Sequence, residues 1–282
     1  MRCGAQAPIA SVGRSVPNQE EALSLTITAQ QQQQFQKEGY FILERAIGEA
    51  DLAVLRDQLD RFIAKTEAAM DASDTDEFGL NRRGQRYFIG NRHVEAERRL
   101  DAFLFGDTVA DICKATIGDD AYLFVEQFVV KMAEVGLKFA WHQDSGYVKY
   151  NMPSYTRTYV TLWCALDDMS EENGTISVLP FSRAGTREVI DHVKDPVLND
   201  LVGYFGDDPG DPVIVPAGSI AVFSSALLHR SGPNRTSRPR RSYVVQYSPE
   251  PILKPDGAVF ELAEPLLLGG QRVGGTAATR PA

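Results

Sequence analysis

The sequence is poor in the residues that most often build disulfides and metal sites, because it holds only three cysteines and four histidines. Cys3, Cys113 and Cys164 share no metal-type spacing, and an odd number of thiols gives no disulfide framework. We interpret them as ordinary thiols. Any histidine-based site must therefore draw on very few positions.

Excess positive charge is also missing. The formal net charge is −9, and non-specific binding to nucleic acid depends on a cationic face. No run approaches the roughly 20 apolar residues that span a bilayer, and the N-terminal stretch lacks the apolar segment of a signal peptide. We therefore expect a cytoplasmic protein with neither nucleic acid nor membrane as a partner.

The remaining composition is that of a globular domain, with 43% hydrophobic and 24% charged residues. Residues 1–24 are small, polar and aperiodic, and we expect a flexible N-terminal arm there. No linker divides the following residues, so 25–265 are predicted to form a single domain. Residues 266–282 are predicted to be a C-terminal tail.

Three helices are predicted before residue 121. Thr28 can cap a helix that ends at Gly39. Apolar residues recur at helical spacing over 49–72, and again over 98–118 with Gly106 as a break.

After residue 121 the pattern changes to short runs rich in β-branched and aromatic residues, separated by turn signals. The runs are AYLFVEQFVVKMA, LKFAWHQDSGYV, YTRTYVTLWCAL, GTISVLPF, PVIVP, GSIAVFSS and RSYVVQYSP. Many short strands at regular spacing are typical of a sandwich or barrel. We therefore predict a mainly β fold with flanking α-helices around one core.

The stretch FAWHQDSGYV places His142 and Asp144 two residues apart. In an extended segment, side chains at i and i+2 point to the same side. His93 and His192 lie in polar, loop-like contexts, whereas His229 stands at the end of an apolar strand. Two histidines and a carboxylate form a facial triad that favours non-haem Fe(II), although isolated histidines are more often structural.

Arg240 follows His229 by eleven positions, where a strand resumes. Strand alternation puts Arg240 and Ser242 on one face and Arg241 on the other. A guanidinium fork binds a carboxylate through two charge-assisted hydrogen bonds, so Arg240 is a candidate for holding a dicarboxylic cosubstrate. Solvation is the alternative, since several arginines crowd this segment.

Residues 28–252 resemble the phytanoyl-CoA dioxygenase-like (PhyH) family of Fe(II)/2-oxoglutarate-dependent oxygenases. The resemblance is carried by WHQDSGYV, LWCALDDMSEENGTISVLPFSRAG and PAGSIAVFSSALLHRSGPNRTSRPRRSYVVQYSPEP. It implies a double-stranded β-helix, the jelly-roll or cupin-like core of these enzymes. It also implies a hydroxylase that uses Fe(II), 2-oxoglutarate and O2 on a small-molecule metabolite and releases succinate and CO2.

The family motif maps iron ligands onto His142, Asp144 and His229 and the cosubstrate arginine onto Arg240. It suggests Thr161 and Ser231 near 2-oxoglutarate. Lys131 and Gln127, which face the same way on the strand before the motif, are predicted to line the cosubstrate pocket. A dry pocket is also expected, with barrel core as the alternative role of each aromatic residue near the motif. These candidates are Phe139, Trp141, Tyr147 and Trp163.

The substrate and the oligomeric state are not written in these motifs. The segment GLNRRGQRYFIGNRHVE holds Arg82, Arg83, Arg86 and Arg92, and REVIDHVKDPVLNDLVGYFGDDPGD is a second candidate for covering the pocket mouth. The first predicts an anionic substrate, or alternatively a solvated loop. A cupin-like metalloenzyme that does not use 2-oxoglutarate, and a non-catalytic jelly-roll binding protein, remain as other functions.

Overall fold

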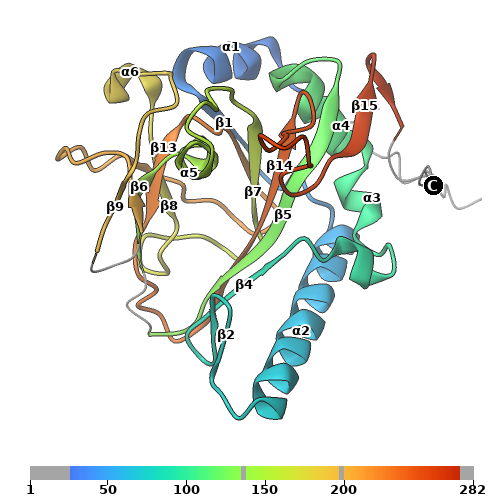
Figure 1. Ribbon diagram of the computed structural model, residues 1–282, viewed down its shortest axis with the longest axis vertical. Coiled ribbons are helices and arrows are strands. Elements are labelled where there is room, and N and C mark those ends of the chain that lie inside the picture. Colours follow the sequence, from blue (N-terminus) through green and yellow to red (C-terminus); the bar gives the residue numbers. More distant parts are fainter. Residues whose placement is uncertain (1–25, 135–137, 197–199, 274–282) are drawn as a thin grey trace, which may run out of the picture.

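The computed structural model describes residues 26–134, 138–196 and 200–273 (Figure 1). In this part of the chain two antiparallel sheets enclose a shared interior, and helices pack on the outer face of the larger sheet. The predicted fold, mainly β with flanking helices around a jelly-roll core, is confirmed. The expected arm, residues 1–24, lies outside the described residues.

The larger sheet contains ten strands among the described residues. Its main order is β1 (Tyr40–Leu43), β12 (Ile220–Ser224), β7 (Val160–Ala165), β14 (Arg240–Ser248), β5 (Ala121–Lys131), β4 (Arg86–Gly90), β3 (Asn81–Arg82) and β2 (Glu77–Phe78). β15 (Glu264–Leu268) also pairs with β5 and carries β16 (Gln271–Arg272).

The smaller sheet completes the barrel and carries two of the candidate ligands. Its order is β11 (Asp211–Pro212), β8 (Ile176–Leu179), β13 (Leu228–Ser231) and β6 (Phe139–His142). A separate pair is formed by β9 (Val193–Lys194) and β10 (Leu201–Val202).

The central strands of the larger sheet are buried on both faces. Every residue of β7 is buried; Leu162 faces the core beneath the helices, whereas Trp163 faces the barrel interior. In β14, Tyr243 and Val245 belong to the helix-side core. Side chains alternate between the two faces of a strand, so the even-numbered residues of β14, which begin with Arg240, point into the barrel.

The predicted helices are present. Their bounds are α1 (Ala29–Glu38), α2 (Glu49–Ala72), α3 (Asp101–Leu104), α4 (Asp107–Thr116), α5 (Asp144–Asn151), α6 (Phe181–Ala184) and the short 3-10 helix η1 (His93–Ala96). Thr28 forms the capping box of α1, and Gly39 ends that helix at φ +87°. Gly106 separates α3 from α4, as predicted. Among the described residues, none of the helices has both the length and the apolar character needed to cross a membrane.

Two segments have more regular structure than the sequence suggested. Residues 79–95, interpreted as a loop, contain β3 and β4, and Phe88 pairs in register with Val129 of β5. From the expected tail, residues 266–273 hold the end of β15 and all of β16, with Leu266 and Leu267 fully buried. Both segments extend the sheet next to β5.

Candidate metal centre and its pocket

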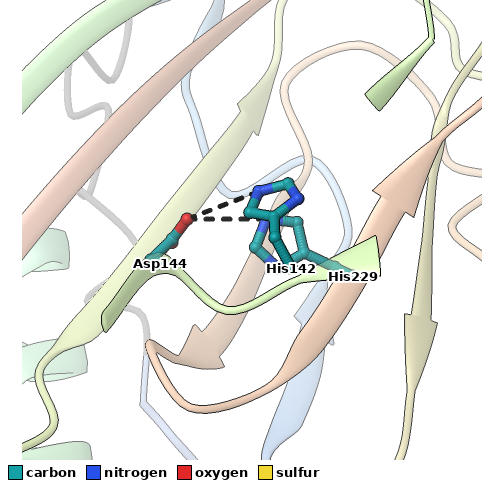
Figure 2. Close-up of side chains that lie close together, drawn as sticks. All are labelled: His142, Asp144 and His229. Atoms are coloured by element: carbon teal, nitrogen blue, oxygen red, sulfur yellow. Dashed lines mark ion pairs between the residues drawn. The ribbon is translucent and has the colours of Figure 1, made fainter. Parts of the chain in front are cut away.

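The three candidate metal ligands converge on one point (Figure 2). His142 ends β6, Asp144 begins α5, and His229 lies opposite His142 in the antiparallel pair of β13 and β6. The Asp144 Oδ1 atom is 3.9 Å from His142 Nε2 and 3.5 Å from His229 Nε2. One ligand atom from each residue lies within 4.8 Å of the others, close enough for all three to hold one metal ion.

The expectation that His142 and Asp144 share one extended strand was wrong. β6 ends at His142, and Asp144 is already helical. Only Gln143 between them is extended, with φ −107° and ψ 141°, and this single residue turns its two neighbours to the same side. The buried Gln143 side chain donates to Ala226 O (2.6 Å) and accepts from Ile190 N (2.9 Å), which fixes this junction.

Both histidines are oriented by backbone carbonyl groups. His142 Nδ1 lies 2.8 Å from Ala140 O, and His229 Nδ1 lies 3.1 Å from Leu227 O. An Nδ1–H that donates to a carbonyl leaves the lone pair on Nε2, the atom nearest Asp144 in each ring. Burial, reinforced by the neighbouring His229, lowers the pKa of His142 well below its usual value, so that this ring is neutral as metal binding requires.

The second oxygen of Asp144 is held by two donors. Thr161 Oγ1 donates to Asp144 Oδ2 at 2.6 Å, and Gln246 Nε2 donates to the same atom at 3.0 Å. Oδ1 is left facing the two histidines. The sequence reasoning missed Gln246, although alternation along the strand from Arg240 and Ser242 puts it on the same face.

Two buried cations lie side by side next to the triad. Arg240 and Lys131 are register partners in β14 and β5, with 1% and 0% of their surfaces exposed. Arg240 donates to Ser242 Oγ (2.9 Å) and Gly174 O (3.0 Å), but its Nε atom has no hydrogen-bond partner. Neither cation forms an ion pair with a carboxylate among the residues described by the structure.

Desolvation dominates the electrostatics of this pair. Burial lowers the pKa of Arg240 to about 10. Burial, followed by repulsion from Arg240, lowers the pKa of Lys131 to about 6. Both shifts mean that the charged forms are disfavoured in the absence of an anion.

The other predicted positions lie around the same site. Lys131 Nζ donates to Ser231 Oγ at 2.7 Å, and Ser231 and Gln127 line the cavity that contains the triad. Thr161 contacts Asp144 instead of the cavity, and Lys131 lies behind Ser231. Gly174, whose carbonyl accepts from Arg240, has φ +74°, and a Cβ atom there would lie 2.5 Å from Gly232 O, so the position requires glycine.

The cavity has a volume of about 370 Å³ and a predominantly apolar wall. Its aromatic lining consists of Phe88, Phe124, Phe139, Tyr147, Tyr159, Trp163, Phe223 and Phe260. Three of the four aromatic residues expected to shield the site are among them. Trp141 is not, because it packs with Leu179 and Leu228 in a separate cluster.

The arginines of residues 79–95 do not form a free basic patch. Three of them form ion pairs: Arg82 with Glu77, Arg83 with Asp71 and Asp76, and Arg92 with Glu95. Arg86 lies over the Phe88 ring, 5.8 Å from its centroid, and donates to Leu80 O. The local excess of positive charge read from the sequence is thus compensated by acidic neighbours.

His93 and His192 are buried, contrary to the polar, loop-like interpretation of their sequence context. His93 Nε2 lies 3.0 Å from Glu264 Oε1, away from the triad. His192 Nε2 accepts from Gln143 N at 2.8 Å and lies so close to Gly146 that a Cβ atom there would be 2.1 Å from the ring. His192 therefore supports the junction between β6 and α5.

A buried triad of two histidines and one carboxylate, inside a jelly roll and beside two cations, defines the class of mononuclear non-haem iron enzymes. Residues 35–242 match the model of the phytanoyl-CoA dioxygenase (PhyH) family. The chain belongs to this family. Family membership and the triad together make it a dioxygenase of the Fe(II)- and 2-oxoglutarate-dependent class.

Known proteins of similar sequence and structure share this architecture. A probable alpha-ketoglutarate-dependent hypophosphite dioxygenase from Stutzerimonas stutzeri is 24% identical over 237 residues, which cover 78% of each chain. The structure of EvdO2 from Micromonospora carbonacea var. aurantiaca, complexed with 2-oxoglutarate, has a TM-score of 0.62 at 20% identity and covers 87% of this chain and 95% of that one. EctD from S. alaskensis, with 2-oxoglutarate and 5-hydroxyectoine, has a TM-score of 0.62 at 23% identity, with 88% of each chain covered.

Proposed function

We propose that the chain hydroxylates a C–H bond of a small-molecule metabolite, with 2-oxoglutarate and O2 consumed and succinate and CO2 released. His142 Nε2, Asp144 Oδ1 and His229 Nε2 are the iron ligands in this proposal. When bound, iron and 2-oxoglutarate supply the oxidising chemistry that cleaves the C–H bond. The protein positions both groups and keeps the site dry.

The observation that carries the proposal is the pair of buried cations next to the triad. Arg240 and Lys131 are almost completely desolvated, and burial lowers the pKa of both. With a pKa of about 6, Lys131 is largely uncharged near neutral pH, whereas Arg240 stays charged, and a buried cation without a carboxylate partner is unfavourable in an apolar interior. A dicarboxylate that reaches from the triad to Arg240 would neutralise this charge, and its far carboxylate would satisfy the unpartnered Arg240 Nε.

The other residues around the site have supporting roles in the proposal. Thr161 and Gln246 hold Asp144 Oδ2, so that Oδ1 keeps its direction toward the iron position. Lys131 and Ser231 form one hydrogen-bonded pair beside Arg240 and add to the carboxylate site. Gln127, on the same strand as Lys131, offers an amide on the cavity wall.

Two other functions make different predictions. A cupin-like metalloenzyme that does not use 2-oxoglutarate would bind metal but would not need Arg240. A non-catalytic jelly-roll binding protein would not need an ordered triad with both Nδ1 atoms and Asp144 Oδ2 already held. The unpaired Arg240 and the ordered ligands favour the oxygenase.

An anaerobic titration of the purified apo-protein with Fe(II) and 2-oxoglutarate tests the proposal. The chelate of 2-oxoglutarate on iron gives a weak visible charge-transfer band. We expect the band in the wild type and its loss in His229→Ala, because two remaining ligands do not hold the metal. His93→Gln is the matched control, since it removes a buried histidine that lies away from the triad and should leave the band unchanged.

Each outcome has a clear meaning. A band that persists in His229→Ala would refute the assignment of the iron ligand. Tight Fe(II) binding without a band in the wild type would favour the metalloenzyme that does not use 2-oxoglutarate. Absence of Fe(II) binding would favour the binding protein. The succinate released with a panel of anionic, neutral and cationic metabolites then identifies the substrate.

A further inference from the structure

The part of the cavity that extends from the triad toward the solvent is largely apolar. Phe260 stacks on Phe124 with ring centroids 6.1 Å apart, and Phe124 contacts Tyr159 edge to face at 5.1 Å. Val125 and Val148 line the same region. Such a wall favours a compact apolar or ring-containing group, and it offers few hydrogen-bonding atoms for a small oxyanion.

The cations near this region are committed elsewhere. Arg240 is assigned to the cosubstrate. Arg230 lies 4.8 Å above the Trp141 ring and donates to Pro209 O, two residues that are not part of the cavity wall. The ammonium group of Lys254 lies over the Phe260 ring at 5.9 Å, outside the lining residues. Arg230 and Arg240 are the cations on the described wall, and the guanidinium of Arg230 is held against Trp141 and Pro209, away from Phe124 and Phe260.

Glu261 is an anion of the cavity wall that lies apart from the triad. Its carboxylate accepts a hydrogen bond from Asn91 Nδ2 at 2.8 Å. Asn91 directly follows β4 and is held against β5, because its Oδ1 accepts from Glu126 N and its own N–H donates to Glu126 O. The backbone of Glu261 has φ +124°, a conformation that a residue with a side chain rarely adopts. Strained residues held by their surroundings are concentrated at ligand-binding sites.

We propose that Glu261 is a specificity-determining residue, which selects a substrate with an apolar, ring-sized body and one cationic amine and disfavours anions. This inference rests on the proposed function, because the substrate is held next to the iron and 2-oxoglutarate. The amine interacts with the Glu261 carboxylate at the cavity mouth, and the apolar body packs on Phe124 and Phe260. Relatives of this chain are named as a probable hypophosphite dioxygenase and as an ectoine dioxygenase, so the substrates in their names differ chemically.

Three probes of similar size and different charge test the proposal: 2-phenylethylamine, 2-phenylethanol and phenylacetate. Their affinities are measured anaerobically by calorimetry on protein loaded with Fe(II) and 2-oxoglutarate. Because Glu261 is exposed, we expect the amine to bind only about threefold to tenfold more tightly than the alcohol, and phenylacetate to bind most weakly. The charge-transfer band is recorded on the same samples.

Two variants isolate the charge of Glu261. Glu261→Gln should bring the affinity for the amine down to that for the alcohol and should improve binding of phenylacetate. Asp256→Asn removes the same charge from the same loop, at a residue outside the cavity wall whose carboxylate caps Ala258 N. It should leave all three affinities unchanged. The band should be present in every variant.

The results separate this inference from the proposed function. Absence of the band in the wild type would refute the oxygenase assignment itself. With the band present, equal or tighter binding of phenylacetate would overturn the charge preference, as would an unchanged preference in Glu261→Gln. Failure of all three probes to bind at millimolar concentration, again with the band present, would overturn the apolar, ring-sized pocket.

Discussion

Replacing Arg240 with methionine should weaken 2-oxoglutarate binding strongly while changing the stability of the apo-protein very little. Burial lowers the pKa of Arg240 by between two and three units, to about 10. Since one pKa unit corresponds to about 1.4 kcal/mol, the buried charge costs the folded state roughly 3 kcal/mol. Because the pKa is lowered in the folded protein, this cost is present at every pH below about 10 and is relieved only above it.

The methionine variant removes this cost but also two hydrogen bonds, to Ser242 Oγ and Gly174 O. Two bonds from a charged donor contribute about 3 kcal/mol together, at the low end because both acceptors are neutral. The two effects nearly cancel, so we expect the free energy of unfolding to change by about 1 kcal/mol or less. In a chain of this size that corresponds to a Tm shift of about 2–4 °C.

Binding of 2-oxoglutarate should respond very differently. Truncation of one partner in a buried, hydrogen-bonded charge pair costs about 2–5 kcal/mol, which is roughly a 30-fold loss of affinity or more. The anaerobic titration gives the affinity, and thermal unfolding gives the stability. Arg241→Met is the control, because Arg241 pairs with Asp167 on the opposite face of β14 and should cost about 1 kcal/mol of stability without affecting affinity.

A structural role for Arg240 would give the reverse pattern. In that case Arg240→Met would lower Tm by more than the control variant and leave the affinity for 2-oxoglutarate unchanged. Such a result would refute the reasoning that this cation is held without a partner for the cosubstrate.

Two further predictions concern the surroundings of the site. Gln246→Leu removes one donor to Asp144 Oδ2, and the affinity for Fe(II) should fall about 10-fold to 100-fold, as measured by competition with a metal chelator; an unchanged affinity would mean that Thr161 alone orients the carboxylate. For His93, burial lowers the pKa, but the neighbouring carboxylates of Glu126 (3.8 Å from Nδ1) and Glu264 (3.0 Å from Nε2) outweigh it and raise the pKa from 6.5 to about 9. The stabilisation of the folded state by charged His93 is therefore complete below pH 6.5 and is lost as the pH rises through about 9. The difference in the free energy of unfolding between the wild type and His93→Gln should shrink between these two pH values. A difference that is constant with pH in denaturant unfolding would contradict a charged His93.

Local signals in the sequence predicted much of the fold and the placement of the site. The capping residue Thr28, the helix stop at Gly39 and the break at Gly106 act within a few residues, and the structure has all three. Alternation along the last long strand correctly directed Arg240 and Ser242 to one face and Arg241 to the other. These features depend only on backbone periodicity, which the sequence records directly.

Features that depend on contacts between distant segments were not predictable in the same way. The burial of His192 depends on Gly146 and Gly203, whose missing side chains make room for its ring. The compensation of Arg83 depends on Asp71 at the end of α2. The helical start at Asp144 was obscured by the strand-like residues before it, so the correct convergence of the two ligands was predicted for the wrong geometric reason.

The charge distribution inside the barrel links the cosubstrate to the preference for the substrate. The chain is acidic overall, with a net charge of −9, yet its interior holds Arg240 and Lys131 desolvated and adjacent. Binding of a dianion to the folded state alone stabilises it by about 2.7 kcal/mol at 100 times Kd, and the relief of the unfavourable burial of Arg240 is already contained in that Kd. In the proposed complex the far carboxylate of that dianion pairs with Arg240, and Glu261 is the carboxylate of the wall that lies apart from the triad. The arrangement that favours 2-oxoglutarate at the inner end of the cavity therefore leaves a field that attracts a cation at its outer end.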